Sequence, residues 1–288
     1  MVLPIKWEGT VTDPDERRVS CTVTDGVADV RLDREAKLNA LDPAMASALI
    51  TTGERLRRDT GVRAVVLSGN GRAFCAGLDM SSFQAMADDE PVRLNHQEEY
   101  PYTGPARATG QRAAYVWAEL PVPVIAAVHG VAFGGGLQIA LGADIRVVAP
   151  DARLSVMEIR WGLVPDMTGS QLLPELVGRD VAKELTFTGR VVNGEEAARI
   201  GLATKVADDP RKAALALAAE IAGKNPDAIR GAKRLLDLAG RTGLADGFTA
   251  EQREIGALIG SPNQVEAVRA NLEERAPVFT DPGEEGYA

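Results

Sequence analysis

The sequence predicts an α/β fold that ends in an α-helical region, on three observations. Residues 64–68, 122–128 and 145–148 form short apolar runs without polar alternation, as expected of strands buried on both faces of a parallel sheet. Helical patterns separate these runs, which gives the strand–helix alternation of α/β domains. After about residue 208 only helical patterns follow, so we expect a core over residues 1–208 and a helical region over residues 209–288.

The first part of the core begins with a hairpin and a capped helix. Residues 20–34 hold two β patterns around Asp25-Gly26, a dipeptide that favours a tight hairpin turn. Asp42-Pro43 supplies a capping residue and a first-turn proline for a helix over residues 44–58. Residues 81–110 are rich in acidic residues, proline and glycine, and we expect a long lid or binding loop there.

The C-terminal region contains three helix starts of one kind, each a capping residue followed by proline. They predict helices over residues 211–223, 227–240 and 263–275. We expect this region to be a docking arm and not a second catalytic domain.

Composition excludes several classes of protein. The net charge is -9, with 32 basic against 41 acidic residues, which argues against general binding to nucleic acid phosphates. Two cysteines, Cys21 and Cys75, cannot build a disulfide framework, and no C-x-x-C pair exists. His96 and His129 are too far apart for an H-E-x-x-H motif. We therefore expect no metal site.

The segment between Glu119 and Asp144 carries no formal charge and is long enough to cross a bilayer. It holds two prolines and a run of three glycines, so we expect a buried strand, a glycine turn and a packed helix, with no membrane contact. The first ten residues include Lys6 and Glu8 and lack an apolar signal core. This predicts a cytoplasmic location.

Two glycine-rich segments follow predicted strands. Residues 69–79 (GNGRAFCAGLD) follow the run 64–68, and residues 129–138 (HGVAFGGGLQ) follow the strand that ends near Val128. The second leads into a helical pattern, and the N–H groups at a helix N-terminus favour negative charge. Neither segment matches a P-loop or dinucleotide motif, and no G-x-S-x-G elbow occurs. Each segment alone also fits a simple tight connection.

Together, AFCAGLD (73–79) and HGVAFGGGLQIALGADIRVV (129–148) resemble the crotonase, or enoyl-CoA hydratase/isomerase, superfamily. KLNAL (37–41), residues 152–178 and EERAPVF (273–279) are also similar to it. The resemblance implies a spiral of repeated ββα units and C-terminal helices that support a homotrimer or hexamer. It also implies an acyl-CoA thioester as substrate, so coenzyme A arrives with the substrate and no separate cofactor is needed.

The resemblance further implies an oxyanion hole made by two backbone N–H groups, those of Leu78 and Gly135. Chemistry next to a thioester produces an enolate, and donors aimed at its oxygen stabilise that charge. Glycine at position 135 lets the substrate approach the backbone closely.

The acid–base residues are the point at which this chain departs from the family pattern. Glu158 matches the second family glutamate, whereas Gln138 occupies the position of the first glutamate of hydratases. Glutamine can contact substrate or hold a water, but it cannot accept a proton. Asp166 resembles a carboxylate of the dienoyl-CoA isomerase branch, or it caps the helix that follows. We expect isomerisation slightly ahead of hydration, and the alternative is a non-catalytic acyl-CoA-binding homologue.

The resemblance also implies where coenzyme A binds. It places the adenine near Ala40 and around Ala76, Asp79 and Met80. Lys37 is a candidate phosphate partner, with a solvated surface lysine as the alternative.

Overall fold

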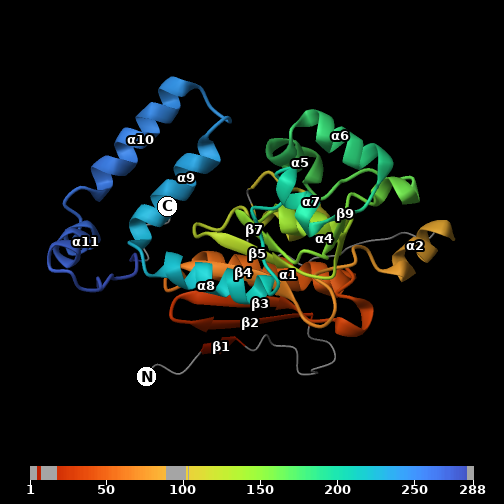
Figure 1. The fold of residues 1–288 in the computed structure, drawn as a ribbon, viewed down its shortest axis with the longest axis horizontal. Coiled ribbons are helices and arrows are strands. Elements are labelled where there is room, and N and C mark those ends of the chain that lie inside the picture. The colour runs from red at the N-terminus through yellow and green to blue at the C-terminus, as the bar shows by residue number, and fades with distance from the viewer. Residues whose placement is uncertain (1–4, 8–17, 89–101, 103, 284–288) are drawn as a thin grey trace.

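The computed structural model describes residues 5–7, 18–88, 102 and 104–283. The architecture is α/β, as the sequence predicts, with a large sheet in the order β1-β2-β3-β4-β5-β7-β10 and a small sheet in the order β6-β8-β9. Figure 1 shows the sheets at the centre of the molecule and helices α9–α11 to one side. The strands are β1 (Ile5–Trp7), β2 (Val19–Thr24), β3 (Val27–Leu32), β4 (Ala64–Gly69), β5 (Val124–Val128), β6 (Val131–Phe133), β7 (Ile145–Val148), β8 (Arg153–Ser155), β9 (Val192–Asn193) and β10 (Lys205–Val206).

The helices follow the strands in alternation, and short 3-10 turns precede two of them. The α-helices are α1 (Pro43–Arg58), α2 (Met80–Ala87), α3 (Thr109–Tyr115), α4 (Gly135–Leu141), α5 (Gly169–Val177), α6 (Arg179–Thr188), α7 (Gly194–Arg199), α8 (Pro210–Ala222), α9 (Pro226–Leu238), α10 (Leu244–Leu258) and α11 (Pro262–Leu272). The 3-10 turns are η2 (Glu35–Lys37) and η3 (Glu158–Trp161).

The large sheet is antiparallel at one edge and parallel from β3 onward. The β2–β3 hairpin turns at Asp25 and Gly26, whose φ angles are 49° and 77°, the left-handed values that a two-residue type I′ turn requires. The predicted hairpin is confirmed. Strands β4, β5 and β7 also lie where the apolar runs predict them.

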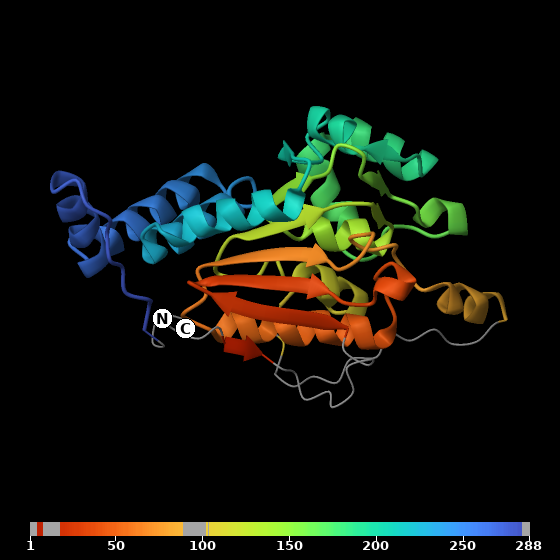
Figure 2. The same ribbon diagram turned by 60° about the horizontal axis from the view of Figure 1, so that its bottom comes forward.

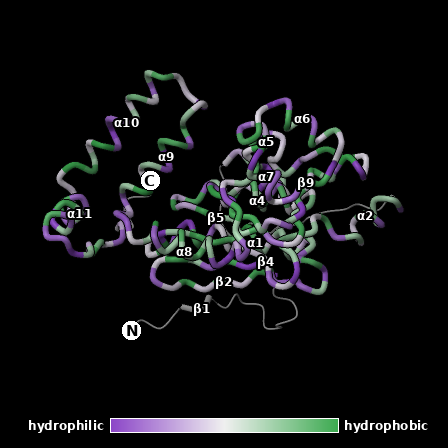
Figure 3. The backbone as a smooth tube through the Cα atoms, viewed as in Figure 1, coloured by the Kyte–Doolittle hydropathy of each residue, from purple (hydrophilic) through white to green (hydrophobic). Residues whose placement is uncertain are grey.

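Both faces of the parallel strands are covered, which explains their unbroken apolar sequence. Val65 and Leu67 of β4 face the core cluster that contains α1. Ala64 and Val66, the alternate residues, face the alanines of α8. Figure 2 shows α1 and α8 on opposite sides of the sheet, and Figure 3 shows hydrophobic residues along these strands. Helix α1 begins as predicted, because the Asp42 carboxylate accepts the N–H of Met45.

The two glycine-rich segments, residues 69–79 and 129–138, lie side by side although they are far apart in the sequence. Cys75 pairs with Ala132 in a parallel bridge. The N–H of Phe74 donates to the carbonyl of His129, and the N–H of Phe133 donates to the carbonyl of Cys75, at 2.9 and 3.1 Å. The second segment forms the short strand β6 before α4 begins at Gly135. These contacts bring the two predicted oxyanion donors to one end of the sheet.

The secondary structure differs from the prediction in two segments. Part of the predicted loop over residues 81–110 is helix α2, because the side chain of Asp79 caps it; residues 89–101 and 103 lie outside the described residues. Helix α10 is not predicted, and its N-cap, Gly243, carries no capping side chain. Within the C-terminal region, α8 packs on the large sheet and α10 packs on α9. In the described residues, no helix is long and apolar enough to span a membrane.

Candidate active site

Leu78 and Gly135 line the same cavity from adjacent segments. The parallel bridge between Leu41 and Leu78 uses the carbonyl of Gly77 and the N–H of Asp79, so it leaves the N–H of Leu78 unused. Gly135 is the first residue of α4, where an N–H has no partner within the helix. The pair of donors predicted from the family resemblance therefore lies at one place, and the helix adds favourable potential for an anion.

Glycine is required where these segments approach each other. Gly77 has a φ of +88°, and a Cβ added there would lie 2.5 Å from the carbonyl oxygen of Phe133 and 3.7 Å from the nitrogen of Gly135. Gly134 also has a positive φ, +51°. A side chain at either position would be strained, and at position 77 it would push the two donors apart.

Glu158 lies next to the donors, at the start of η3. A Cβ added at Gly134 would lie 3.4 Å from its Oε1. The side chain is buried, and its Oε2 has no hydrogen-bond partner in the described residues. Burial raises the pKa of the Glu158 carboxyl, more than the hydrogen bonds from its own backbone N–H and from Gln138 lower it, and the charge of Asp166 raises it further. A carboxyl of this kind is suited to proton transfer near neutral pH.

Gln138 connects Glu158 to the loop that precedes α5. Its Nε2 donates a 2.6 Å hydrogen bond to Oε1 of Glu158. Its Oε1 accepts hydrogen bonds from the N–H groups of Met167 and Gly169, both at 2.9 Å. Between them, Thr168 has a φ of +76°, which is unusual for a β-branched residue. The amide of Gln138 is 2% exposed and its acceptor oxygen is used by the protein itself.

Asp166 is exposed and lines the same cavity as Glu158. It is not the N-cap residue of α5, since that position belongs to Thr168, whose side chain makes no capping hydrogen bond. The capping alternative considered for Asp166 is therefore not observed. Its carboxylate instead acts on Glu158 through its charge.

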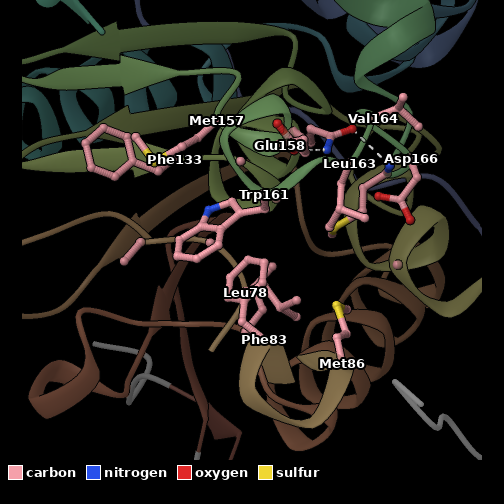
Figure 4. A pocket seen from close by; sticks show the side chains of 18 of the residues that line it. Leu78, Phe83, Met86, Phe133, Met157, Glu158, Trp161, Leu163, Val164 and Asp166 are labelled. Carbon is pink, nitrogen blue, oxygen red and sulfur yellow. Dashed lines mark hydrogen bonds between the residues drawn. The ribbon is translucent and has the colours of Figure 1, made fainter. Parts of the chain in front are cut away.

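The cavity around these groups has a volume of about 630 Å³. Leu78, Gly135, Gln138, Glu158 and Asp166 all line it, together with apolar side chains from α2, β6 and η3. Figure 4 shows Phe83 and Met86 of α2 on one side, Trp161 between, and Leu163 and Val164 on the opposite side, close to Asp166. Phe83 and Met86 lie in the segment that was expected to be a lid or binding loop, but the sequence did not single out these two side chains.

Some of the residues predicted to bind coenzyme A line the cavity, and others do not. Ala76 and Met80 line the cavity, and Ala40 is buried beside it. Lys37 is an exposed residue of η2 that does not line the cavity. Asp79 is 6% exposed and forms an ion pair with Arg34.

The carboxylate of Asp79 is used within the protein. Burial would raise its pKa, but hydrogen bonds from Ser81 and Arg34 lower it to about 2. It also accepts the N–H of Ser81 at 2.9 Å as the cap of α2. Asp79 therefore fixes the start of α2, and side chains of this helix form part of the cavity wall.

Asn39 is a residue of the KLNAL segment whose role the sequence did not reveal. It is fully buried, with a φ of +57°. Its Nδ2 donates to the carbonyls of Asn70 and Ala73 at 3.0 and 2.8 Å, and its Oδ1 accepts the N–H of Arg34. Asn39 thus fastens the first glycine segment, which carries Leu78, to the turn after β3.

Comparison with known proteins agrees with this arrangement. The sequence matches the family model Enoyl-CoA hydratase/isomerase over residues 22–282. Mouse enoyl-CoA hydratase domain-containing protein 2 is 34% identical over 261 residues, 88% of this chain and 84% of the relative. Mouse methylglutaconyl-CoA hydratase is 31% identical over 282 residues, 95% of this chain and 86% of the relative.

A solved structure is similar over nearly the whole fold. The enoyl-CoA hydratase of Bacillus anthracis superposes with a TM-score of 0.80 at 30% identity, covering 91% of this chain and 99% of that chain. The fold class expected from the sequence, including the crotonase architecture and its C-terminal helices, is thus confirmed. With two glycine segments at one end of the sheet and a matching fold around them, the chain belongs to the enoyl-CoA hydratase/isomerase family, the crotonase superfamily, and is an acyl-CoA enzyme.

Proposed function

We propose that this enzyme moves a double bond along an enoyl-CoA thioester, with Glu158 as the base and the N–H groups of Leu78 and Gly135 as the oxyanion hole. The observation that carries the proposal is the meeting of three groups at one cavity: two backbone donors and one buried carboxyl with a raised pKa. The donors stabilise negative charge on the thioester oxygen, and the carboxyl transfers the proton.

The reaction needs one proton and no other reactant. Glu158 removes a proton from C2 of a 3-enoyl thioester, and the electron pair of the C–H bond passes into an enolate whose oxygen accepts hydrogen bonds from Leu78 and Gly135. The protonated carboxyl then returns the same proton to C4. The double bond moves from C3–C4 to C2–C3, and Glu158 is again a carboxylate.

Gln138 is the reason for placing isomerisation ahead of hydration. Hydration is best served by two carboxylates that hold and activate a water. The acceptor oxygen of Gln138 is already occupied by Met167 and Gly169, and its amide lies directly against Glu158. This leaves Glu158 as the main proton carrier, with Asp166 as a second candidate that faces the same cavity.

Hydration is the second candidate, since relatives of this chain carry hydratase names. Mass spectrometry of products formed in heavy-oxygen water separates the two reactions. Isomerisation of a 3-enoyl-CoA leaves the mass unchanged, whereas hydration of a 2-enoyl-CoA adds labelled water. A Glu158→Gln control should lack both products. Labelled hydroxyacyl-CoA as the main product would overturn the isomerase preference, and binding without any product would favour a non-catalytic homologue.

The C-terminal helices are proposed to assemble the chain into a homotrimer or a hexamer of two trimers. Leu244, Phe248 and Ile255 of α10 are exposed, as is its C-cap residue Ile259, and the spacing of the three helical residues places them in one row along α10. Phe248→Asp should reduce the particle mass measured by light scattering, while Thr249→Asp, a matched change beside the row, should not. A monomeric native protein would refute the assembly. The cytoplasmic location stays a prediction.

A further inference from the structure

The wall of the active-site cavity carries charge of one sign. Among its described residues, the formally charged side chains are Glu158 and Asp166, both acidic. The other lining groups are apolar side chains, glycines and a few neutral polar residues. A ligand group that is itself negative would therefore meet like charge at close range, with no described lysine, arginine or histidine on the wall to oppose it.

The part of the cavity beyond the oxyanion donors is apolar and incompletely covered. The rings of Phe83 and Trp161 stack with centroids 4.1 Å apart, which joins α2 to η3 across the cavity wall. Among the other apolar side chains that line the cavity, Met86, Leu163 and Val164 remain 42%, 40% and 71% exposed. Large apolar side chains that stay accessible around one cavity are typical of a site for an apolar ligand group.

We infer that the enzyme selects acyl groups that are neutral and apolar, and discriminates against acyl groups that end in a second carboxylate. The inference rests on the proposed function, because it takes the thioester to lie at Leu78 and Gly135. The acyl chain then extends along the Phe83–Trp161 pair. A terminal carboxylate would lose hydration against the apolar part of this wall, where no described cationic side chain compensates for the loss, and would also be repelled by Glu158 and Asp166.

Calorimetric binding of two unreactive thioesters tests the selection directly. Octanoyl-CoA and octanedioyl-CoA have the same chain length and the same coenzyme A, so the difference in their dissociation constants isolates the terminal carboxylate. We expect octanoyl-CoA to bind at least about tenfold more tightly. The difference should shrink at high salt, because part of it is repulsion between charges. Equal affinities at low salt would overturn the inference.

A variant of the wall provides the second test. Met86→Arg places a cation on α2, away from the backbone donors, and should strengthen octanedioyl-CoA binding relative to octanoyl-CoA. Met86→Gln is the matched control, which changes polarity and size without adding charge, and should leave the preference for octanoyl-CoA in place. If arginine and glutamine have the same effect on the ratio, charge on the wall does not set the selection.

The two proposals fail in different ways. Both thioesters are saturated, so their binding does not depend on Glu158 as a base or on the reaction assigned to it. A tenfold preference without turnover of any enoyl-CoA would refute the isomerase and keep the selection. Turnover of enoyl-CoA esters with equal binding of the two probes would keep the isomerase and refute the selection. Failure of both probes to bind would refute the thioester site and the selection together.

Discussion

The side-chain amide of Gln138 donates a 2.6 Å hydrogen bond to Oε1 of Glu158, a contact between α4 and η3 at the floor of the active site. It fixes one oxygen of the carboxylate, while the buried Oε2 has no hydrogen-bond partner in the described residues. A glutamate at position 138 would place two carboxylates against each other. The glutamine therefore sets both the orientation and the charge of the proposed base.

Glu158→Gln should lower kcat by about 10²–10⁴-fold, since an amide cannot transfer the proton. Binding of an unreactive acyl-CoA, measured by calorimetry, should stay within about threefold of the native value, because the two backbone N–H groups are retained. Glu158→Asp is the companion variant, which keeps the acid but shortens its reach. Native rates in Glu158→Gln would show that another group carries the proton.

The same substitution should leave the melting temperature equal or higher near neutral pH. Folding raises the pKa of Glu158, so this carboxyl favours the folded state at pH below its ordinary value. The benefit is lost as the pH rises through the raised folded-state value, where a buried charge forms. Melting curves over about pH 4–8 should therefore diverge with rising pH. A variant that is less stable than the native enzyme throughout would contradict this.

Asp166→Asn should shift the acid limb of the kcat/KM profile to lower pH. The charge of Asp166 raises the pKa of Glu158, so removing it makes the base easier to deprotonate. If Asp166 acts only through its charge, the rate on the plateau should stay within about threefold. A loss of about 10² or more on the plateau, with an unmoved limb, would instead identify Asp166 as a proton carrier.

Gln138→Glu should move the acid limb to higher pH, opposite to Asp166→Asn, because two adjacent carboxylates resist joint ionisation. It should also raise the ratio of hydrated to isomerised product. The acceptor for Met167 and Gly169 is kept, but two buried carboxyls now lie in contact, so the loss of unfolding free energy should be small at acidic pH and grow as the pH rises. Gln138→Leu removes that acceptor and leaves two buried N–H groups unpaired, which should cost about 2–4 kcal/mol of unfolding free energy. Urea unfolding of both variants checks the contrast.

Gly135→Pro should remove one oxyanion donor with little effect on folding, since proline is favoured at the first position of a helix. An added Cβ meets the ends of Leu41 and Met167 at 2.8 Å, and Gly135→Ala is the control for this crowding because it keeps the N–H. Relative to alanine, proline should lower kcat by about 10²–10³-fold. Equal rates in the two variants would exclude the Gly135 N–H from catalysis.

The sequence predicts this molecule well where local chemistry decides the structure. Asp25-Gly26 determines a turn and Asp42-Pro43 a helix start, because each acts on its own neighbours. Helix α10 escaped prediction because Gly243 offers no capping side chain. The carboxylate of Asp79 caps α2 and pairs with Arg34, contacts that the sequence did not reveal; its place beside the adenine stays a prediction.

In the candidate site, too, residues in short sequence motifs could be predicted, whereas contacts between distant segments could not. Leu78 and Gly135 could be named because the glycine segments that carry them resemble family motifs, which are short and continuous in the sequence. The bonds from Gln138 to Glu158 and to the loop before α5 join three segments of the fold, and no short motif encodes them. The role of Asn39 depends on a similar meeting of distant backbone groups.

The two oxyanion donors are backbone amides, and amides do not gain or lose a proton in the range in which the enzyme is folded. The electrophilic half of the site is therefore constant in charge, and the described cavity wall adds only carboxyl groups that titrate. Turnover should rise once with pH and then remain level on the alkaline side. Within the described cavity wall the ionisable side chains are carboxyls, so the pH dependence expected from them is one rise in turnover from acidic to neutral pH.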